Sequence, residues 1–272
     1  MRNYKCHSLI IGGTGQFGIS LKNQLNKKKH KVIITSRSKK SRIKNKFFEV
    51  VVLDIYNKEK IFKIIKKYKP QNIFYFAGQS SPSISFVKKK ETLRSNYIGC
   101  KNVLECVYEI NKDIKFIYAA SSEMYGKING KISLKSKKIP VNPYGISKLK
   151  GFNLVKLYRE KYNLNTYSAI IFNTESILRD KSFFIPKVCM AAINAYKYNL
   201  KTKFGNLDIK REWNWCDDQC ELLIKFLKKE PQDFIISNGK SFSAKKMLKF
   251  AFDYFNLDYK KYVIQDKKLL RP

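Results

Sequence analysis

The feature that most constrains the fold is a glycine-rich loop close to the amino terminus. An apolar run over residues 8–11 leads into GGTGQFG at 12–18, and a segment with helical periodicity follows. The glycines at positions 12, 15 and 18 suit a tight turn, close approach of the backbone to a pyrophosphate, and close packing of helix on sheet. The phosphate would then lie at the positive end of the helix dipole. This pattern predicts a dinucleotide-binding unit, and a mere tight turn is the alternative.

Apolar runs typical of β-strands alternate with helical segments through the first 170 residues. We expect strands over 8–11, 31–35, 47–53, 72–76, 115–119 and 166–171, and helices over 17–27, 58–68, 91–110 and 144–162. This alternation predicts right-handed crossovers and an α/β fold with a doubly wound parallel sheet of the Rossmann type.

The rhythm of strands and helices weakens after residue 172. There we expect helices over 186–198, 217–228 and 244–255, with short strands near 203 and over 234–237. We therefore predict a dinucleotide-binding domain over 1–172. A smaller α/β substrate-binding portion over 173–272 is expected to interleave with it.

Charge and cysteine content bound the class of protein. The 272 residues include 56 Lys and Arg against 21 Asp and Glu, a net charge of +35, which invites a nucleic-acid or anionic-membrane partner. The lysines are scattered through every segment, so we expect solvated faces and neither partner. The apolar runs all fall short of the roughly 18 residues of a membrane span. Six irregularly spaced cysteines and two histidines predict reduced, mostly buried thiols, no metal site and a cytoplasmic protein.

The residues expected to bind the cofactor follow the first four strands. Those in the glycine loop are Gly12, Thr14, Gly15, Gln16, Phe17 and Gly18. Arg37 follows the second strand, where an NAD site usually places an acidic residue for the ribose hydroxyl. A guanidinium group suits a 2′-phosphate, so we favour NADP over NAD, with a surface arginine as the alternative.

Two further segments are expected beside the cofactor. Asp54, followed by Ile55, closes the third strand and could accept a hydrogen bond from the adenine amine or cap the next helix. After the fourth strand, where the backbone must pass close to the cofactor, come Ala77, Gly78 and Gln79. Asn96, in the following helix, is ambiguous by itself.

A catalytic set follows the fifth strand, which ends in ASSEMYG at 120–126. In PYGISK, at 143–148, Tyr144 and Lys148 are four residues apart at a helix start and share one face. The ammonium group, with a positive nicotinamide, would lower the phenol pKa and make Tyr144 a base near neutral pH. Ser121 could share a hydrogen bond with the substrate oxygen. Both Tyr144 and Lys148 are also expected to touch the cofactor; an ordinary helix surface is the alternative.

Several stretches together resemble an extended short-chain dehydrogenase/reductase of the nucleotide-sugar type, and most of all the GDP-mannose 4,6-dehydratase family. They are GTGQFG, AGQSS, SSEMYGK, NPYGISK, FNTES, FGNLDIKREW and EPQDFIISNG, and the last three go beyond generic motifs. The resemblance covers nearly the whole chain. It implies conversion of GDP-mannose to GDP-4-keto-6-deoxy-mannose by internal hydride transfer through NADP.

The resemblance also implies a role for each catalytic residue. Ser121, Glu123, Tyr144 and Lys148 match the site: Tyr144 takes the proton of the sugar 4-OH, and Glu123 removes H5 as water leaves C6. Related reductases can carry a similar SSE stretch, so Glu123 could instead be a strand-end carboxylate. An NADP-dependent reductase or epimerase acting on a GDP-linked 4-keto-6-deoxy sugar is therefore the alternative. An inactive dinucleotide-binding protein is a further one.

Substrate contacts are implied mostly in the second half of the chain. The matching residues are Ser81, Asn173, Glu175, Lys187, Arg211 and Arg271, with both arginines on the diphosphate. A solvated charge is the alternative for each basic residue. The chain departs from the family in Asn214-Trp215-Cys216, in a short segment after Arg37, and in lacking the stretch that normally follows Arg-Pro. We expect a homodimer or higher homo-oligomer, with tetramer contacts in doubt.

Overall fold

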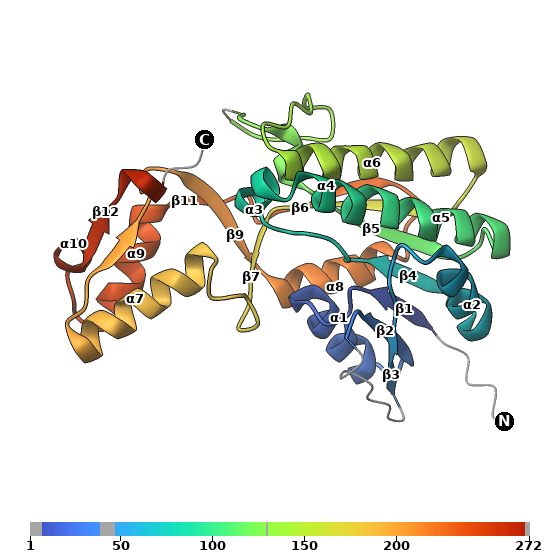
Figure 1. Ribbon diagram of the computed structural model, residues 1–272, viewed down its shortest axis with the longest axis horizontal. Coiled ribbons are helices and arrows are strands. Elements are labelled where there is room, and N and C mark those ends of the chain that lie inside the picture. Colours follow the sequence, from blue (N-terminus) through green and yellow to red (C-terminus); the bar gives the residue numbers. More distant parts are fainter. Residues whose placement is uncertain (1–6, 39–46, 129, 270–272) are drawn as a thin grey trace. The chain divides into compact units, whose positions relative to one another are not determined.

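The computed structural model describes residues 7–38, 47–128 and 130–269, and it contains two compact units (Figure 1). The first unit comprises the described residues up to Phe172 together with Cys216–Ile236. The second comprises Asn173–Trp215 and the described residues from Ser237 onward. The boundary falls at residue 172 as expected, but the segment 216–236 belongs to the first unit and not to the second.

A parallel sheet forms the centre of the first unit. Its strands in the described chain are β1 (Ser8–Ile11), β2 (Val32–Ser36), β3 (Phe48–Val52), β4 (Asn72–Tyr75), β5 (Lys115–Ser121), β6 (Thr166–Ile171) and β10 (Asp233–Ile236). They lie in the order β10-β6-β5-β4-β1-β2-β3, and every neighbouring pair is parallel. The order reverses between β1 and β4, where a doubly wound sheet opens a crevice at the carboxyl ends of its strands. The predicted α/β fold is confirmed.

Both faces of this sheet are buried, which explains the nearly continuous apolar runs of its strands. Leu9 and Ile11 of β1 enter one core, and Ile10 between them enters the other. Helices α2 (Lys58–Tyr68), α5 (Gly99–Ile110) and α6 (Pro143–Tyr162) supply the first core, whereas α1 (Gln16–Lys27) and α8 (Cys216–Phe226) supply the second.

The segment 216–236 returns to the first unit because α8 carries an apolar face. Cys216, Cys220 and Leu223 have helical spacing, and all three are buried in the second core. Helix α8 lies beside α1 (Figure 1), and Ser20 of α1 donates a hydrogen bond to Asp217 of α8. Strand β10 then pairs with β6 at the sheet edge.

The helix predicted over 91–110 is interrupted. The structure has α4 (Lys89–Leu93), a π-helical turn over Arg94–Ile98, and then α5. Such turns are often found at functional sites. Periodicity alone missed this one because one extra residue in a turn hardly disturbs an apolar pattern.

The second unit is built from short elements. They are β7 (Asn173–Glu175), α7 (Phe184–Tyr198), β8 (Thr202–Phe204), β9 (Lys210–Trp215), β11 (Ser241–Ser243), α9 (Ala244–Asp253), α10 (Tyr259–Tyr262) and β12 (Val263–Gln265). In the described residues β11-β9-β7 form one small sheet and β12-β8 another. The strands β7, β9, β11 and β12 were not predicted. The first three have three to six residues that are mostly polar or charged, and β12 has only three residues.

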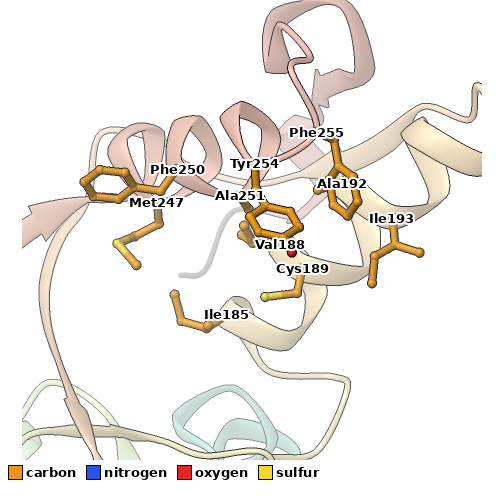
Figure 2. Close-up of a pocket in the computed structure, with 10 residues that line it drawn as sticks. All are labelled: Ile185, Val188, Cys189, Ala192, Ile193, Met247, Phe250, Ala251, Tyr254 and Phe255. Carbon is orange, nitrogen blue, oxygen red and sulfur yellow. The ribbon is translucent and has the colours of Figure 1, made fainter.

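Helices α7 and α9 share the core of the second unit. Beside that core their apolar side chains border a hollow of about 420 Å³ (Figure 2). Cys189 of α7 lines it and is exposed, whereas Cys100, Cys106, Cys216 and Cys220 are buried free thiols. None of the described helices combines the length and apolar character needed to cross a membrane.

Candidate active site

The glycine loop after β1 fits a phosphate group. Gly12 has φ +87°, and a Cβ there would lie 2.6 Å from the Ala77 backbone nitrogen, so both conformation and space require glycine. A Cβ on Gly18 would overlap the Gly13 backbone. In contrast, a Cβ on Gly15 would meet only the Gly12 carbonyl oxygen, at 3.6 Å. Gly12 and Gly18 are therefore required by packing, and Gly15 remains approachable from outside.

The amino end of α1 lies directly behind Gly15. Gly15 is its N-cap, with no side-chain capping hydrogen bond, and no acidic side chain occupies the first turn. The N–H groups at a helix start, together with the helix dipole, attract an anion. Thr14 is exposed, but the Phe17 ring packs against Phe76 with a centroid distance of 5.3 Å. Phe17 can therefore offer a ligand its backbone, while its side chain belongs to the core.

The loop after β4 is tied to the π-helical turn. The Gln79 backbone N–H donates to Ser95 Oγ at 3.1 Å, and Asn96 Nδ2 donates to the Gln79 carbonyl at 3.0 Å. A Cβ on Gly78 would overlap the Asn96 amide. Ala77 and Gly78 precede Gln79, so these contacts fix the segment that faces Gly12 across the carboxyl ends of β1 and β4.

Asp54 and Ile55 have different surroundings. Asp54 is exposed, and its carboxylate accepts a hydrogen bond from the Tyr56 N–H at 3.0 Å. Asn57, and not Asp54, caps α2 by accepting from the Lys60 N–H at 2.8 Å, so the capping interpretation of Asp54 is wrong. The Ile55 side chain packs on the first core.

Arg37 is one of two guanidinium groups near Tyr56. Burial raises the pKa of the Tyr56 phenol, and the positive charges of Arg94 and Arg37 counteract that rise. The Arg94 guanidinium carbon lies 4.3 Å from the Tyr56 ring centroid. Arg37 and Arg94 are both exposed. The sequence analysis missed Arg94, which belongs to the π-helical turn and had no recognisable motif.

Glu123 is held by the start of α6. Ser121 ends β5, and its Oγ accepts a hydrogen bond from the Glu123 N–H at 3.2 Å. The Glu123 carboxylate accepts one from Asn142 Nδ2 at 2.7 Å. Asn142 is buried, and its Oδ1 caps α6 by accepting from the Gly145 N–H at 2.8 Å. The carboxylate is therefore fixed to the helical turn that carries Tyr144.

Tyr144 and Lys148 lie on one face of α6, as predicted. Both are buried, and Lys148 Nζ lies 5.7 Å from the Tyr144 ring centroid. Lys148 Nζ donates a hydrogen bond to the Ala119 carbonyl at 2.8 Å. Burial lowers the pKa of Lys148 to about 8, and the nearby Cys100 opposes this shift. The ammonium form therefore predominates at pH 7.

Two asparagines complete this arrangement. Asn96 is fully buried, and its Nδ2 also bonds Ser147 Oγ at 3.1 Å, so it connects the Gln79 loop to α6. Asn142 could have been recognised from sequence as an N-cap followed by Pro143 at the first helical position. Asn96 offers no such local signal, because its role depends on the π-helical turn.

Ser81 has a structural role in its own loop. Its Oγ caps the short helix α3 (Pro82–Val87) by accepting from the Ile84 N–H at 3.3 Å. The Gln79 side chain closes the turn by bonding the Ser81 backbone at 2.7 and 3.0 Å. The cap occupies one acceptor position of the hydroxyl, which retains a proton to donate.

The other described residues expected to bind substrate lie in the second unit. They are Asn173 and Glu175 on β7, Lys187 on α7 and Arg211 on β9. Arg211 is exposed, whereas Lys187 is half-buried with its Nζ 4.8 Å from the Phe204 ring centroid. Arg271 and most of the segment after Arg37 lie outside the described residues.

A buried glutamate that the sequence analysis missed organises β9. The Glu212 carboxylate accepts hydrogen bonds from Ser237 Oγ and the Asn238 N–H, each at 2.7 Å, and from Asn214 Nδ2 at 2.8 Å. Asn214 Nδ2 also bonds the Asn173 carbonyl at 3.3 Å. Asn214, one of the departures from the family pattern, thus connects this network to the predicted substrate residue Asn173.

Glu175 is an unusual carboxyl group. Its side chain is 12% exposed, one buried oxygen has no hydrogen bond, and Arg179 Nε lies 4.0 Å away. Burial raises the pKa of Glu175 to about 7, although Arg179 opposes the shift. The pKa of Glu175 is about 4.5 in the unfolded chain and about 7 in the folded one. Its contribution to the stability of the fold is therefore fully present below pH 4.5 and is lost as the pH rises through about 7.

We therefore expect Glu175→Gln to raise the thermal stability at pH 8 and to change it little at pH 5. The neutral amide avoids the cost of burying a carboxylate, and the pKa shift sets an upper limit of about 3 kcal/mol. Thermal unfolding of both proteins from pH 5 to 8.5 measures this, with exposed Glu160→Gln as the matched control. A stability difference that does not depend on pH would contradict the assignment.

The fold and this arrangement define the class of protein. The glycine loop, the sheet order and the Tyr144–Lys148 pair are those of an extended short-chain dehydrogenase/reductase. Solved structures agree on the fold: dTDP-glucose 4,6-dehydratase of Bacillus anthracis superposes with a TM-score of 0.83 at 20% identity, over 96% of this chain and 85% of that one. UDP-glucose 4-epimerase of Thermus thermophilus gives 0.84 at 17% identity, over 95% and 85%.

Sequence comparison identifies the family. The family model described as GDP-mannose 4,6 dehydratase matches residues 9–271. The Drosophila melanogaster GDP-mannose 4,6 dehydratase is 30% identical over 92% of this chain and 68% of its own length. The human GDP-mannose 4,6 dehydratase is 32% identical over 73% of this chain and 55% of its own length. This chain belongs to the GDP-mannose 4,6-dehydratase family, an enzyme family, and the prediction of the family is confirmed.

Proposed function

We propose that this chain converts GDP-mannose to GDP-4-keto-6-deoxy-mannose with NADP as its cofactor. The observation that carries the proposal is Glu123, which Asn142 fixes at the helical turn bearing Tyr144. Oxidation at C4 needs one base, whereas loss of water from C5 and C6 needs a second. Glu123 supplies that second base in addition to the Tyr144–Lys148 pair.

Four side chains perform the proton chemistry in this proposal. Tyr144 accepts the proton of the sugar 4-OH, and the Lys148 ammonium stabilises the phenolate that results. The Ser121 hydroxyl donates a hydrogen bond to the oxygen at C4. The glycine loop and Arg37 would hold NADP, which would supply the hydride acceptor for C4 and the hydride donor for C6 with no net consumption. Glu123 takes the proton at C5, which the 4-keto group acidifies, and the proton held by Tyr144 leaves with the C6 hydroxyl as water. Glu123 then returns its proton to C5 when C6 receives the hydride.

The second unit supplies most of the binding residues, and Ser81 of the first unit adds one more. Arg211 offers a planar fork of donors that suits a diphosphate, and Lys187 offers a point charge. Asn173, Glu175 and Ser81 are assigned to the sugar-nucleotide side of the same ligand. The net charge of +35 favours encounter with an anionic nucleotide sugar. For Arg271 a diphosphate contact stays a prediction, as do a homo-oligomeric state and a cytoplasmic location.

The preference for NADP rests on the surroundings of Arg37. Arg37 directly follows β2, and its positive charge, like that of Arg94, acts to lower the pKa of Tyr56. A guanidinium group at this position suits the two negative charges of a 2′-phosphate better than the neutral hydroxyl of NAD.

Arg37→Ala is expected to weaken NADP binding about 10- to 100-fold and to leave NAD binding almost unchanged. A hydrogen bond to a charged group contributes about 1.5–3 kcal/mol, which corresponds to that range. Titration calorimetry with both cofactors measures the two affinities. Lys66→Ala is the matched control, because it removes one exposed positive charge on α2. Equal losses for NADP and NAD would remove the basis for the preference.

Incubation of the purified chain with GDP-mannose and catalytic NADP⁺, followed by NMR of the sugar, tests the proposed function. We expect a C6 methyl doublet together with a keto or hydrated C4. Unchanged GDP-mannose, with protein that is folded and stabilised by NADP, would overturn the proposal. A parallel reaction with the GDP-linked 4-keto-6-deoxy sugar and NADPH tests the reductase alternative, which predicts consumption of both.

A further inference from the structure

Tyr118 of β5 connects the active-site lysine to the π-helical turn. It is fully buried, and its ring centroid lies 5.1 Å from Lys148 Nζ. Its hydroxyl donates a hydrogen bond to the Asn96 carbonyl at 3.2 Å. A Cβ on Gly151 of α6 would overlap this hydroxyl, so α6 can pack against Tyr118 only because residue 151 is glycine. The Tyr118 side chain therefore contacts both the π-helical turn and α6, the helix that carries Tyr144 and Lys148.

Tyr75 of β4 provides a natural comparison for Tyr118. It is buried to the same degree, and its ring lies beside that of Tyr118 with a centroid distance of 6.2 Å and an interplanar angle of 24°. Its hydroxyl donates to the Ser95 carbonyl at 2.7 Å, beside Gly99. The two tyrosines thus bond consecutive carbonyls of the π-helical turn, but of the two only the Tyr118 ring lies beneath Lys148 Nζ.

The Lys148 ammonium group needs such a neighbour. A buried cation is costly unless polar or aromatic groups replace its water. None of the described carboxylates forms an ion pair with it. The groups around it are the Ala119 carbonyl and Tyr118 from β5, Cys100 from α5, and Tyr144 from α6. Aromatic faces attract a cation, and more strongly where the cation is desolvated.

We propose that Tyr118 is a positioning residue that keeps Lys148 charged and aimed at Tyr144. The ring faces the ammonium group, and the hydroxyl fixes the ring by anchoring it to the Asn96 carbonyl. The consequence for turnover rests on the proposed function, because the charged lysine matters there by stabilising the Tyr144 phenolate. The effect on Lys148 itself requires neither substrate nor cofactor.

The titration of Lys148 tests this proposal directly. In protein labelled with ¹³C at the lysine ε-carbons, the Lys148 resonance is identified by its absence from Lys148→Arg. Its midpoint near pH 8 separates it from exposed lysines. Tyr118→Leu removes the ring and is expected to lower the midpoint by about one pH unit. Tyr118→Phe keeps the ring but removes the hydrogen bond to the Asn96 carbonyl, so a smaller shift of the midpoint is expected.

Tyr75→Phe is the matched control, and it should leave the Lys148 midpoint unchanged. An unchanged midpoint in folded Tyr118→Leu would overturn the proposal, as would an equal shift in Tyr75→Phe. If Tyr118→Leu fails to fold, Tyr118→Met serves the same test, since methionine fills similar space with a flexible chain.

Activity measurements separate this proposal from the proposed function. In active protein, Tyr118→Leu should move the alkaline limb of the pH–rate profile to lower pH, in step with the midpoint. A wild-type protein without dehydratase activity, but with the expected shift in Lys148, would overturn only the proposed function. If the wild type is active but Tyr118→Leu leaves the Lys148 titration midpoint unchanged, only the role of Tyr118 is overturned.

Discussion

Tyr144→Phe is expected to reduce turnover of GDP-mannose by a factor of about 10²–10⁴, the usual contribution of a positioned general base. The substitution removes the hydroxyl that accepts the 4-OH proton but keeps the ring. Tyr144 is only 9% exposed, and its ring centroid lies 5.7 Å from Lys148 Nζ, so the packing of α6 is retained. NADP affinity should therefore stay within a few-fold of the wild type. Product formation by NMR and NADP titration give the two quantities.

Tyr125→Phe is a matched control for this substitution. Tyr125 is also buried, and its hydroxyl makes no hydrogen bond among the described residues. Loss of that hydroxyl should leave turnover unchanged and cost no stability, since removing an unsatisfied buried polar group is favourable. Full activity in Tyr144→Phe would refute its role as the base, whatever the control shows.

Much of the first unit could be predicted because its strands follow a simple physical rule. A parallel strand covered on both faces is buried along its length and mostly apolar, as in β1 and β2, and the helices between are amphipathic. The second unit follows no such rule. Strand β9 exposes Lys210 and Arg211 and buries Glu212, so its pattern resembles neither a strand nor a helix. Only partners distant in sequence, such as Ser237 and Asn238, reveal why it is extended.

The candidate site shows the same division. Residues in local motifs could be predicted: Tyr144 and Lys148 share a helix face because they are four residues apart. Asn96 could not be assigned, because its position depends on the π-helical turn and on contacts with Gln79 and Ser147. The anchoring of Glu123 by Asn142 joins two motifs 19 residues apart. Such contacts between motifs are set by tertiary packing and cannot be recognised from the spacing of residues within a motif.

Glu123→Gln is expected to spare oxidation at C4 and to slow loss of water by a factor of about 10²–10⁴. Glutamine has the same shape, and its carbonyl oxygen can still accept the hydrogen bond from Asn142, which is 2.7 Å in the wild type. The variant therefore loses the base and little of the geometry. We expect up to one equivalent of reduced cofactor by absorbance, with almost no C6 methyl signal in the NMR spectrum of the sugar.

Two further variants allow this result to distinguish a dehydratase from a reductase. Glu160→Gln, an exposed change on the same helix as Tyr144, should leave both steps unchanged. Asn142→Ala removes the cap of α6, at a cost of about 0.5–2 kcal/mol, and also frees the Glu123 carboxylate, so it should slow water loss more than oxidation. If Glu123 only held the loop in place, glutamine would replace it without loss and the normal 6-deoxy product would form. A second base, in contrast, cannot be replaced by an amide, because an amide does not take up the C5 proton at neutral pH.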